Sequence, residues 1–316
     1  MSRIEKLKGI LAPVPTFIDE TGDVDLQANL AACDRLLKTE IGGLFLFGTT
    51  GAFAYFSIQD RKKYIKFMCE NLKSEKPVVY CVQHWNTKYA LELTEYAIEC
   101  GAEYLAALLP VYFSVAEDGI KKYYREIRSV IDQKKPDVPL YMYHIPILQS
   151  TAEIKPEIVI ELAEEGTLAG IKDSVFDIKH ARAVLSGVND DFNFLCGTEP
   201  LLADAVKDGK LVKKFDGGVF TGVNIMPNSY SRMINAAISG DFETYNKIEP
   251  VVSRIIETWS EDISYLPHVC KYAMKYEGYP VVDLPCSPLT IIGDDIKENV
   301  REAVDNAKGF WGSDDI

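Results

Sequence analysis

The sequence lacks the short motifs that most often hold nucleotides, metal ions or a catalytic serine. It contains no GxxxxGKS/T, GxGxxG, HExxH or GxSxG pattern and no CxxC pair. These absences argue against a P-loop nucleotide enzyme, a dinucleotide-binding fold, a zinc protease and an α/β-hydrolase. The chemistry of this chain must therefore depend on another arrangement of side chains.

The chain also lacks an excess of basic charge and any long apolar run. Lys and Arg number 34 against 47 Asp and Glu, so the net charge is −13. Because nucleic acids and anionic membranes both attract basic surfaces, we expect neither as a partner. No apolar run approaches the length of a membrane span, and no apolar targeting segment opens the sequence, which favours a cytoplasmic protein.

Cysteine is present without the spacing of a disulfide framework or a metal site. The seven cysteines are an odd number, and the spacing of Cys69 and Cys81 is the shortest among them. We expect reduced thiols that pack as small apolar side chains, as is usual in the cytosol.

Short apolar runs recur along the 316 residues and alternate with segments of helical periodicity. Such short runs are typical of buried parallel strands. Eight strand–helix units predict an α/β fold, a closed (β/α)8 TIM barrel, because the competing doubly wound sheet usually carries a glycine-rich fingerprint after its first strand. The expected strands are residues 9–13, 43–47, 78–82, 104–108, 140–144, 168–171, 194–196 and 217–220.

The sequence after residue 228 predicts helices almost to its end. These helices are expected over residues 229–239, 242–261, 265–276 and 296–307. Because one barrel unit needs a single helix, we expect residues 1–228 to form the barrel and residues 229–316 to form a C-terminal helical extension packed on it.

Two polar segments follow expected strands, at the end of the barrel where active sites lie. Gly48-Thr49-Thr50-Gly51 follows the second strand, and its amides and hydroxyls suit a carboxylate, although a simple turn is the alternative. Tyr143 lies on the fifth strand and suits acid–base work, although a core aromatic residue is the alternative.

Lys172 directly follows the apolar run of the sixth strand. Lysine is rarely placed inside a barrel, and its amine can attack a carbonyl to form an imine, although a lysine that extends to the rim is the alternative. A carboxylate-binding turn, a tyrosine and a lysine together predict imine chemistry on an α-keto acid. Asp173, Asp177 and His180 are spaced for one helix face and form a weaker metal candidate, with a solvated helix start as the alternative.

At these residues the sequence resembles the dihydrodipicolinate synthase and N-acetylneuraminate lyase family of class I aldolases. The Gly48–Gly51 turn, Tyr143-x-x-Pro146 and Gly170-Ile171-Lys172-Asp173 match the family in order and spacing. The resemblance implies a TIM barrel, usually a homotetramer built as a dimer of dimers. It implies no metal and no organic cofactor, and a small keto acid containing a pyruvate moiety as the substrate.

The resemblance also implies a role for each matching residue. Lys172 is the expected Schiff-base lysine and Tyr143 the expected proton shuttle. The remaining implied positions are Thr49 and Thr50 at the pyruvate carboxylate and in proton relay, Phe220 through its backbone at the pyruvate site, and Tyr112 as a tyrosine exchanged between subunits.

Departures from the family pattern favour one substrate class. Leu148 stands where dihydrodipicolinate synthases carry an arginine, and His144 and Ala52 replace an asparagine and a glutamate. Ser174 and the single acid Glu199 match the aldolases of 2-keto-3-deoxy sugar acids, although Glu199 has a helix cap as its alternative role. We therefore predict a carbon–carbon lyase that releases pyruvate and an aldehyde, with N-acetylneuraminate lyase, dihydrodipicolinate synthase and a catalytically silent keto-acid-binding barrel as alternatives.

Overall fold

The computed structural model describes residues 6–110, 113–149, 154–258 and 262–311. Its eight parallel strands form one closed barrel in the order β1 to β8, which confirms the predicted TIM barrel. The strands are β1 Gly9–Pro13, β2 Gly43–Leu46, β3 Val78–Cys81, β4 Tyr104–Leu108, β5 Leu140–His144, β6 Gly170–Asp173, β7 Asn193–Cys196 and β8 Gly217–Val219.

Helices follow the strands as the periodicity predicts. Asp25 caps the first helix by accepting a hydrogen bond from the amide of Ala28, and Ser57 and Asp60 form a capping box at the start of the second. The helices are α1 Leu26–Leu37, α2 Ile58–Asn71, α3 Thr87–Glu99, α4 Glu117–Lys134, α5 Pro146–Gln149, α6 Pro156–Glu164, α7 Ile178–Gly187, α8 Glu199–Asp208, α9 Pro227–Ser239, α10 Phe242–Glu257, α11 Leu266–Tyr276 and α12 Asp294–Trp311.

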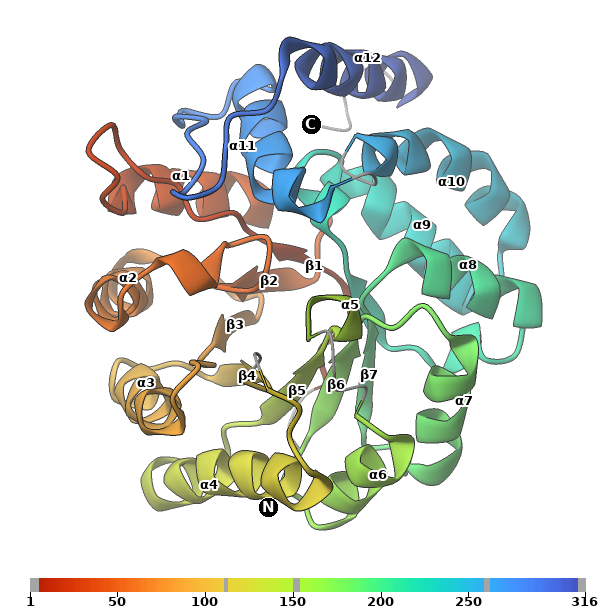
Figure 1. Ribbon diagram of the computed structural model, residues 1–316. Helices are drawn as coiled ribbons and strands as arrows, with labels where there is room; N and C mark the ends of the chain where they lie inside the picture. The colour runs from red at the N-terminus through yellow and green to blue at the C-terminus, as the bar shows by residue number, and fades with distance from the viewer. Residues whose placement is uncertain (1–5, 111–112, 150–153, 259–261, 312–316) are drawn as a thin grey trace. The chain divides into compact units, whose positions relative to one another are not determined.

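The chain divides into two compact units. The first consists of the described residues within Met1–Lys8, Pro77–Val219 and Ala237–Gly240. In it, strands β3 to β8 pair in sequence order, and α3, α4, α6 and α7 pack against one another in turn, with β4 to β7 side by side in Figure 1. The residues of these strands are almost all buried, as strands covered on both faces require.

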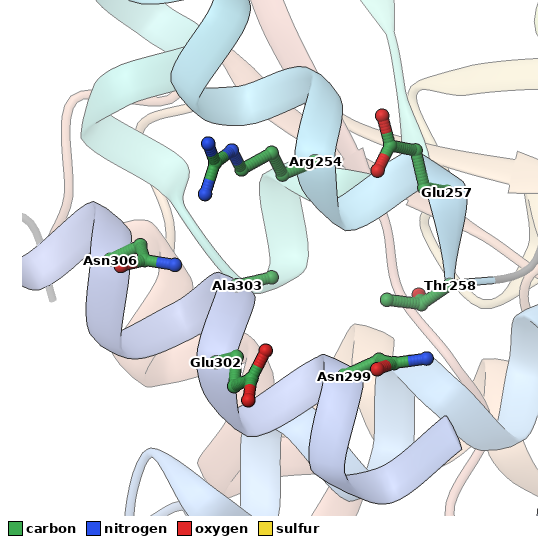
Figure 2. Close-up of a pocket in the computed structure, with 7 residues that line it drawn as sticks. All are labelled: Arg254, Glu257, Thr258, Asn299, Glu302, Ala303 and Asn306. Carbon is green, nitrogen blue, oxygen red and sulfur yellow. The ribbon is translucent and has the colours of Figure 1, made fainter. Parts of the chain in front are cut away.

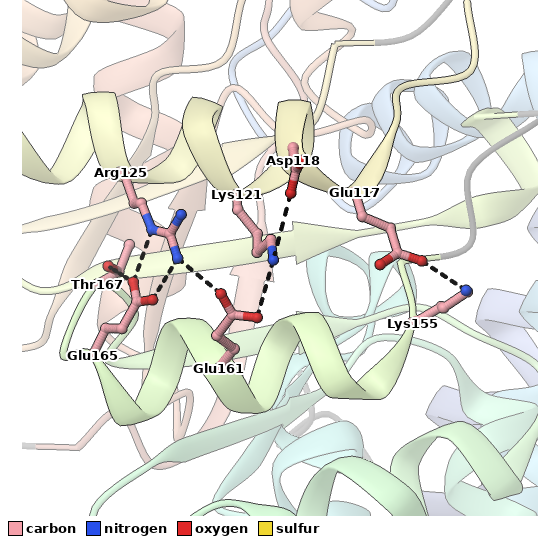
Figure 3. A network of polar contacts seen from close by, with 8 residues as sticks. All are labelled: Glu117, Asp118, Lys121, Arg125, Lys155, Glu161, Glu165 and Thr167. Atoms are coloured by element: carbon pink, nitrogen blue, oxygen red, sulfur yellow. Dashed lines mark hydrogen bonds and ion pairs between the residues drawn. The ribbon is translucent and has the colours of Figure 1, made fainter.

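Ion pairs connect α4 and α6 on the surface of this first unit (Figure 3). Arg125 pairs with both Glu161 and Glu165, and Lys121 lies 3.1 Å from Glu161. These side chains are partly solvent-exposed, so each pair contributes little by itself, and their value lies in the network that aligns the two helices.

The second unit consists of the described residues within Gly9–Lys76, Phe220–Ala236 and Asp241–Ile316. Here β1 pairs with β2, and α12 packs against both α10 and α11. A polar surface pocket lies between α10 and α12, and Figure 2 shows the side chains that line it, namely Arg254, Glu257, Thr258, Asn299, Glu302, Ala303 and Asn306. None of the residues expected to act in catalysis lines this pocket.

The expectations about the cysteines and about membrane-spanning segments can now be compared with the structure. All seven cysteines are free thiols, as their spacing predicts. Within the described ranges, no helix is both long and apolar enough to cross a membrane. The boundary expected near residue 228, between barrel and helical extension, stays a prediction.

Candidate active site

Lys172 and Tyr143 lie on neighbouring strands of the first unit. They are directly opposite in the register of β5 and β6, and the Lys172 Nζ is 4.1 Å from the centre of the Tyr143 ring. Both side chains are buried, at 5% and 1% exposure. An ammonium group over an aromatic face is attracted by the ring quadrupole, so the ring serves as a platform that orients the amine.

The sixth strand begins and ends later than the sequence suggests. The apolar run predicts residues 168–171, whereas β6 covers Gly170–Asp173 and includes Lys172 itself. A run of apolar residues identifies the part of a strand whose side chains are buried without polar partners. It misses Lys172 and Asp173, because these polar side chains are buried in contact with partners from other segments. The predicted lysine is therefore part of the barrel wall.

Ser174 and Glu199 follow β6 and β7 in the same unit. Ser174 is buried, its amide donates to the carbonyl of His144 at 2.8 Å, and its hydroxyl lies 3.4 Å from the carbonyl oxygen of Gly197. Gly197 is required here, because a Cβ would lie 2.1 Å from the Ser174 Oγ. Glu199 is half-buried in the first turn of α8, but the side chain that caps this helix is Thr198.

The Thr49–Thr50 segment follows β2 in the second unit. The Thr50 Oγ1 lies 2.9 Å from the Thr221 Oγ1, and the amide of Ala52 donates to the Thr49 carbonyl at 2.8 Å. The left-handed backbone is found at Phe47 and Ala52, which flank the turn, rather than at its two glycines. Non-glycine residues held there cost about 1–3 kcal/mol each, a strain typical of ligand-binding segments.

Phe220 follows β8 in the second unit and is buried at 1% exposure. Its ring centre is 6.1 Å from that of Tyr230, so the side chain packs into the core while its backbone ends the strand. Lys172, Tyr143, Ser174 and Glu199 thus belong to the first unit, and Thr49, Thr50 and Phe220 to the second. Tyr112 lies outside the described residues.

A buried polar cluster behind Lys172 and Tyr143 is the feature that the sequence patterns misassign. The Asp173 carboxylate lies 2.9 Å from the Nδ1 of His144 through one oxygen and 2.9 Å from the Nδ1 of His180 through the other. Asp173 and His144 are fully buried, and His180 is 4% exposed. Burial alone would raise the pKa of Asp173, but hydrogen bonds to the two imidazoles, together with the positive charge that an imidazole carries when protonated, lower it below its usual value.

Asp173, Asp177 and His180 do not share the expected helix face, although Asp177 does mark a helix start. Asp173 ends β6, Asp177 caps α7 through the amide of Lys179, and only His180 lies within the helix. His144 is the true third member. Strand alternation carries this signal, since His144 and Asp173 each follow a predicted catalytic residue and so face the opposite side of the sheet.

Comparison with known proteins places these features in a family. A model of the dihydrodipicolinate synthetase family matches residues 6–307. YagE of Escherichia coli strain K12, provisionally named a 2-dehydro-3-deoxy-D-gluconate aldolase, is 26% identical over 288 residues, covering 89% of this chain and 91% of YagE. The solved structure of YagE, in complex with pyruvate, has a TM-score of 0.85 at 23% identity over 95% of this chain and 98% of that one, a likeness that shows the fold.

A third comparison concerns a relative of higher identity over a shorter segment. The 2-dehydro-3-deoxy-D-gluconate/2-dehydro-3-deoxy-phosphogluconate aldolase of Picrophilus torridus is 33% identical over 195 residues, which cover 61% of this chain and 70% of that protein.

Proposed function

The chain belongs to the dihydrodipicolinate synthetase family, and from this premise we propose that it is a carbon–carbon lyase that cleaves a 2-keto-3-deoxy sugar acid into pyruvate and an aldehyde. The observation that carries the proposal is the buried amine of Lys172 held 4.1 Å from the ring centre of Tyr143. The names of YagE and of the Picrophilus torridus aldolase support the same substrate class.

The proposed reaction begins with attack of the Lys172 amine on the keto carbon of the substrate. The carbonyl oxygen leaves as water, and a protonated imine forms that can accept an electron pair. Removal of the proton from the C4 hydroxyl then breaks the C3–C4 bond and releases the aldehyde, while its electrons enter the imine as an enamine. Tyr143 accepts and returns the proton, C3 is protonated, and water hydrolyses the imine to free pyruvate and the lysine.

The remaining site residues have the roles that the family resemblance implies. Thr49 and Thr50 bind the pyruvate carboxylate through hydroxyl and amide donors, and the backbone at Phe220 borders the same moiety. Tyr112 completes the proton relay from a neighbouring subunit of a homotetramer. This assignment includes a cytosolic location, in keeping with seven free thiols.

Sugar-acid specificity follows from the groups near the distal end of the substrate. Leu148 offers no guanidinium to a second carboxylate, whereas Ser174 and Glu199 can donate to and accept from hydroxyl groups. The main competing function is dihydrodipicolinate synthesis, in which aspartate semialdehyde condenses with pyruvate. A site that hydrogen-bonds hydroxyl groups rejects analogues without them by up to about 10⁴–10⁵-fold.

Borohydride trapping tests the chemistry. Reduction in the presence of pyruvate should attach a stable adduct to the peptide that contains Lys172. Lys271 is an internal control, because it is also fully buried, and its peptide should stay unlabelled. Label on another lysine, or no label, would contradict the imine mechanism.

A competition assay tests the substrate class. The kcat/KM for keto-deoxy sugar acids is compared with that for pyruvate plus aspartate semialdehyde, in the native protein and in Glu199→Ala. Asp204 lies on the same helix and pairs with Lys207 at 2.9 Å, so Asp204→Ala is the matched control. Preference for aspartate semialdehyde, or full sugar-acid cleavage by Glu199→Ala, would refute the sugar-acid assignment.

A further inference from the structure

Four segments of the first unit converge on the Asp173 carboxylate. His144 ends β5, Asp173 ends β6, His180 lies in the first turn of α7, and Ile154 precedes α6. The Ile154 amide lies 3.1 Å from the Nε2 of His144, and the Ile154 carbonyl oxygen lies 2.8 Å from the Nε2 of His180. Both histidines thus bind the carboxylate with one ring nitrogen and the same backbone residue with the other.

The backbone groups determine which ring nitrogens carry protons. The Ile154 amide can only donate, so the Nε2 of His144 is unprotonated and its Nδ1 carries the hydrogen that it donates to Asp173. The Ile154 carbonyl can only accept, so the Nε2 of His180 carries a hydrogen. His144 is therefore a neutral imidazole of defined tautomer.

One further proton must lie between His180 and Asp173. The Nδ1 of His180 and the Oδ2 of Asp173 are 2.9 Å apart, and two bare acceptors at that distance would repel each other. Imidazole is the stronger base of the two groups, with an ordinary pKa of about 6.5 against about 3.9 for an aspartate, so we assign the proton to the imidazole rather than to the carboxyl. The lowered pKa of Asp173 agrees with this assignment. The cluster then consists of a carboxylate, an imidazolium and a neutral imidazole, with no net charge in a buried site.

These hydrogen bonds also explain why the cluster is not suited to a metal ion as it stands. His144, Asp173 and His180 have ligand atoms within 4.8 Å of one another. However, every ring nitrogen and both carboxylate oxygens already take part in a hydrogen bond. Metal ligation would require deprotonated nitrogens and would break the bonds to Ile154 or to the carboxylate.

We propose that the cluster of His144, Asp173 and His180 is a positioning device for the lysine and the tyrosine of the site. Tyr143 directly precedes His144 on β5, and Lys172 directly precedes Asp173 on β6. The end of each strand therefore carries one predicted catalytic residue and one residue of the cluster. The two strands are therefore joined on one face by the amine–ring contact and on the other by a charged hydrogen bond. The proposal rests on the proposed function for the roles of Lys172 and Tyr143.

The protonation pattern can be measured without any activity. The chain has only four histidines, so solid-state ¹⁵N spectra of histidine-labelled protein can be assigned with single His→Gln variants. His180 should show two protonated ring nitrogens at pH 7, and His144 only a protonated Nδ1. His268 is a neutral reference, because burial lowers its pKa and its Nδ1 accepts the amide of Ile292 at 2.9 Å. A neutral His180 in the native protein would overturn the proposal.

Asp173→Asn is the decisive variant because it preserves every hydrogen bond. The amide oxygen can accept from His144, and the amide nitrogen can donate to the Nδ1 of His180, which then becomes neutral. The cluster stays uncharged overall, so the variant should fold and should show His180 with a single protonated nitrogen. A His180 that keeps both protons in this variant would contradict the proton count.

Kinetics separate positioning from general stability. Asp173→Ala should lower kcat by about 10–100-fold, the usual effect of a residue that orients a catalytic group, whereas Asp173→Asn should rescue most of kcat. Equal losses in folded Asp173→Asn and Asp173→Ala would refute the positioning role even if the native protein is an active aldolase. An inactive native protein would instead refute the proposed function, and the spectra would still decide the protonation of the cluster.

Discussion

Removing the hydroxyl of Tyr143 separates the chemistry of this residue from its packing. Tyr143→Phe keeps the ring on which the Lys172 amine lies, 4.1 Å from its centre. That contact, worth about 0.5–2 kcal/mol in a buried setting, should survive in the variant. Only the hydroxyl that we propose to accept and return the proton is lost.

The expected loss in turnover is large and specific to one step. A single positioned acid–base group contributes about 10²–10⁴-fold, which corresponds to about 2.7–5.5 kcal/mol of transition-state stabilisation. Imine formation depends on the amine rather than on this hydroxyl. We therefore expect Tyr143→Phe to lower kcat by that factor while borohydride still traps pyruvate on Lys172.

A tyrosine two residues earlier on β5 provides the matched control. The Tyr141 hydroxyl donates to the Asn193 Oδ1 at 2.9 Å, and this buried side chain has no predicted catalytic role. Tyr141→Phe should cost about 0.5–1.5 kcal/mol of stability, measured by urea unfolding, and leave kcat close to the native value. Pyruvate release is followed in a coupled assay for both variants. Near-native turnover of Tyr143→Phe, or equal losses in both variants, would refute the reasoning.

Three further predictions concern stability. Asn193→Ala removes three buried hydrogen bonds and should lower the unfolding free energy in urea by about 2–4 kcal/mol, so a change below about 0.5 kcal/mol would contradict the value given to these bonds. Gly197→Ala places a Cβ 2.1 Å from the Ser174 Oγ and should cost about 1–3 kcal/mol, and an unchanged denaturation midpoint would show that the loop can shift. Because the pKa of Asp173 is lowered in the folded protein, this group binds fewer protons there than in the unfolded protein near pH 4. The unfolding free energy should therefore fall as the pH drops below about 4, and acid titration of Asp173→Asn should show a smaller fall.

The bounds of the strands show how much of the fold could be predicted from the local sequence. Three of them, β1, β4 and β5, have the expected bounds, because each is a short run of mostly apolar residues. β6 is displaced by two residues toward its carboxyl end, since Lys172 and Asp173 are polar and their burial depends on partners from other strands. The run of apolar residues cannot contain that information.

The turn after β2 shows a second feature that the local sequence does not predict, namely which residues adopt left-handed backbone. Left-handed backbone is adopted there by Phe47 and Ala52, although glycine is the residue type that adopts it most easily. Gly51 is small for another reason, since a Cβ there would lie 3.2 Å from the Phe47 Cα. The preference of a residue for a backbone angle is local, whereas the closeness of another segment is a property of the fold.

The sequence by itself predicted the barrel, the order of its strands and the candidate lysine and tyrosine of the site, because strand periodicity and the spacing of motifs are local quantities. Only the tertiary structure decided that Lys172 lies over Tyr143 and that His144, Asp173 and His180 meet. Their separations along the chain are 29 and 7 residues, and no local pattern links a strand end to a helix turn in that way. Such groups become partners because parallel strands align their carboxyl ends, and burial then requires every polar atom to find a hydrogen bond.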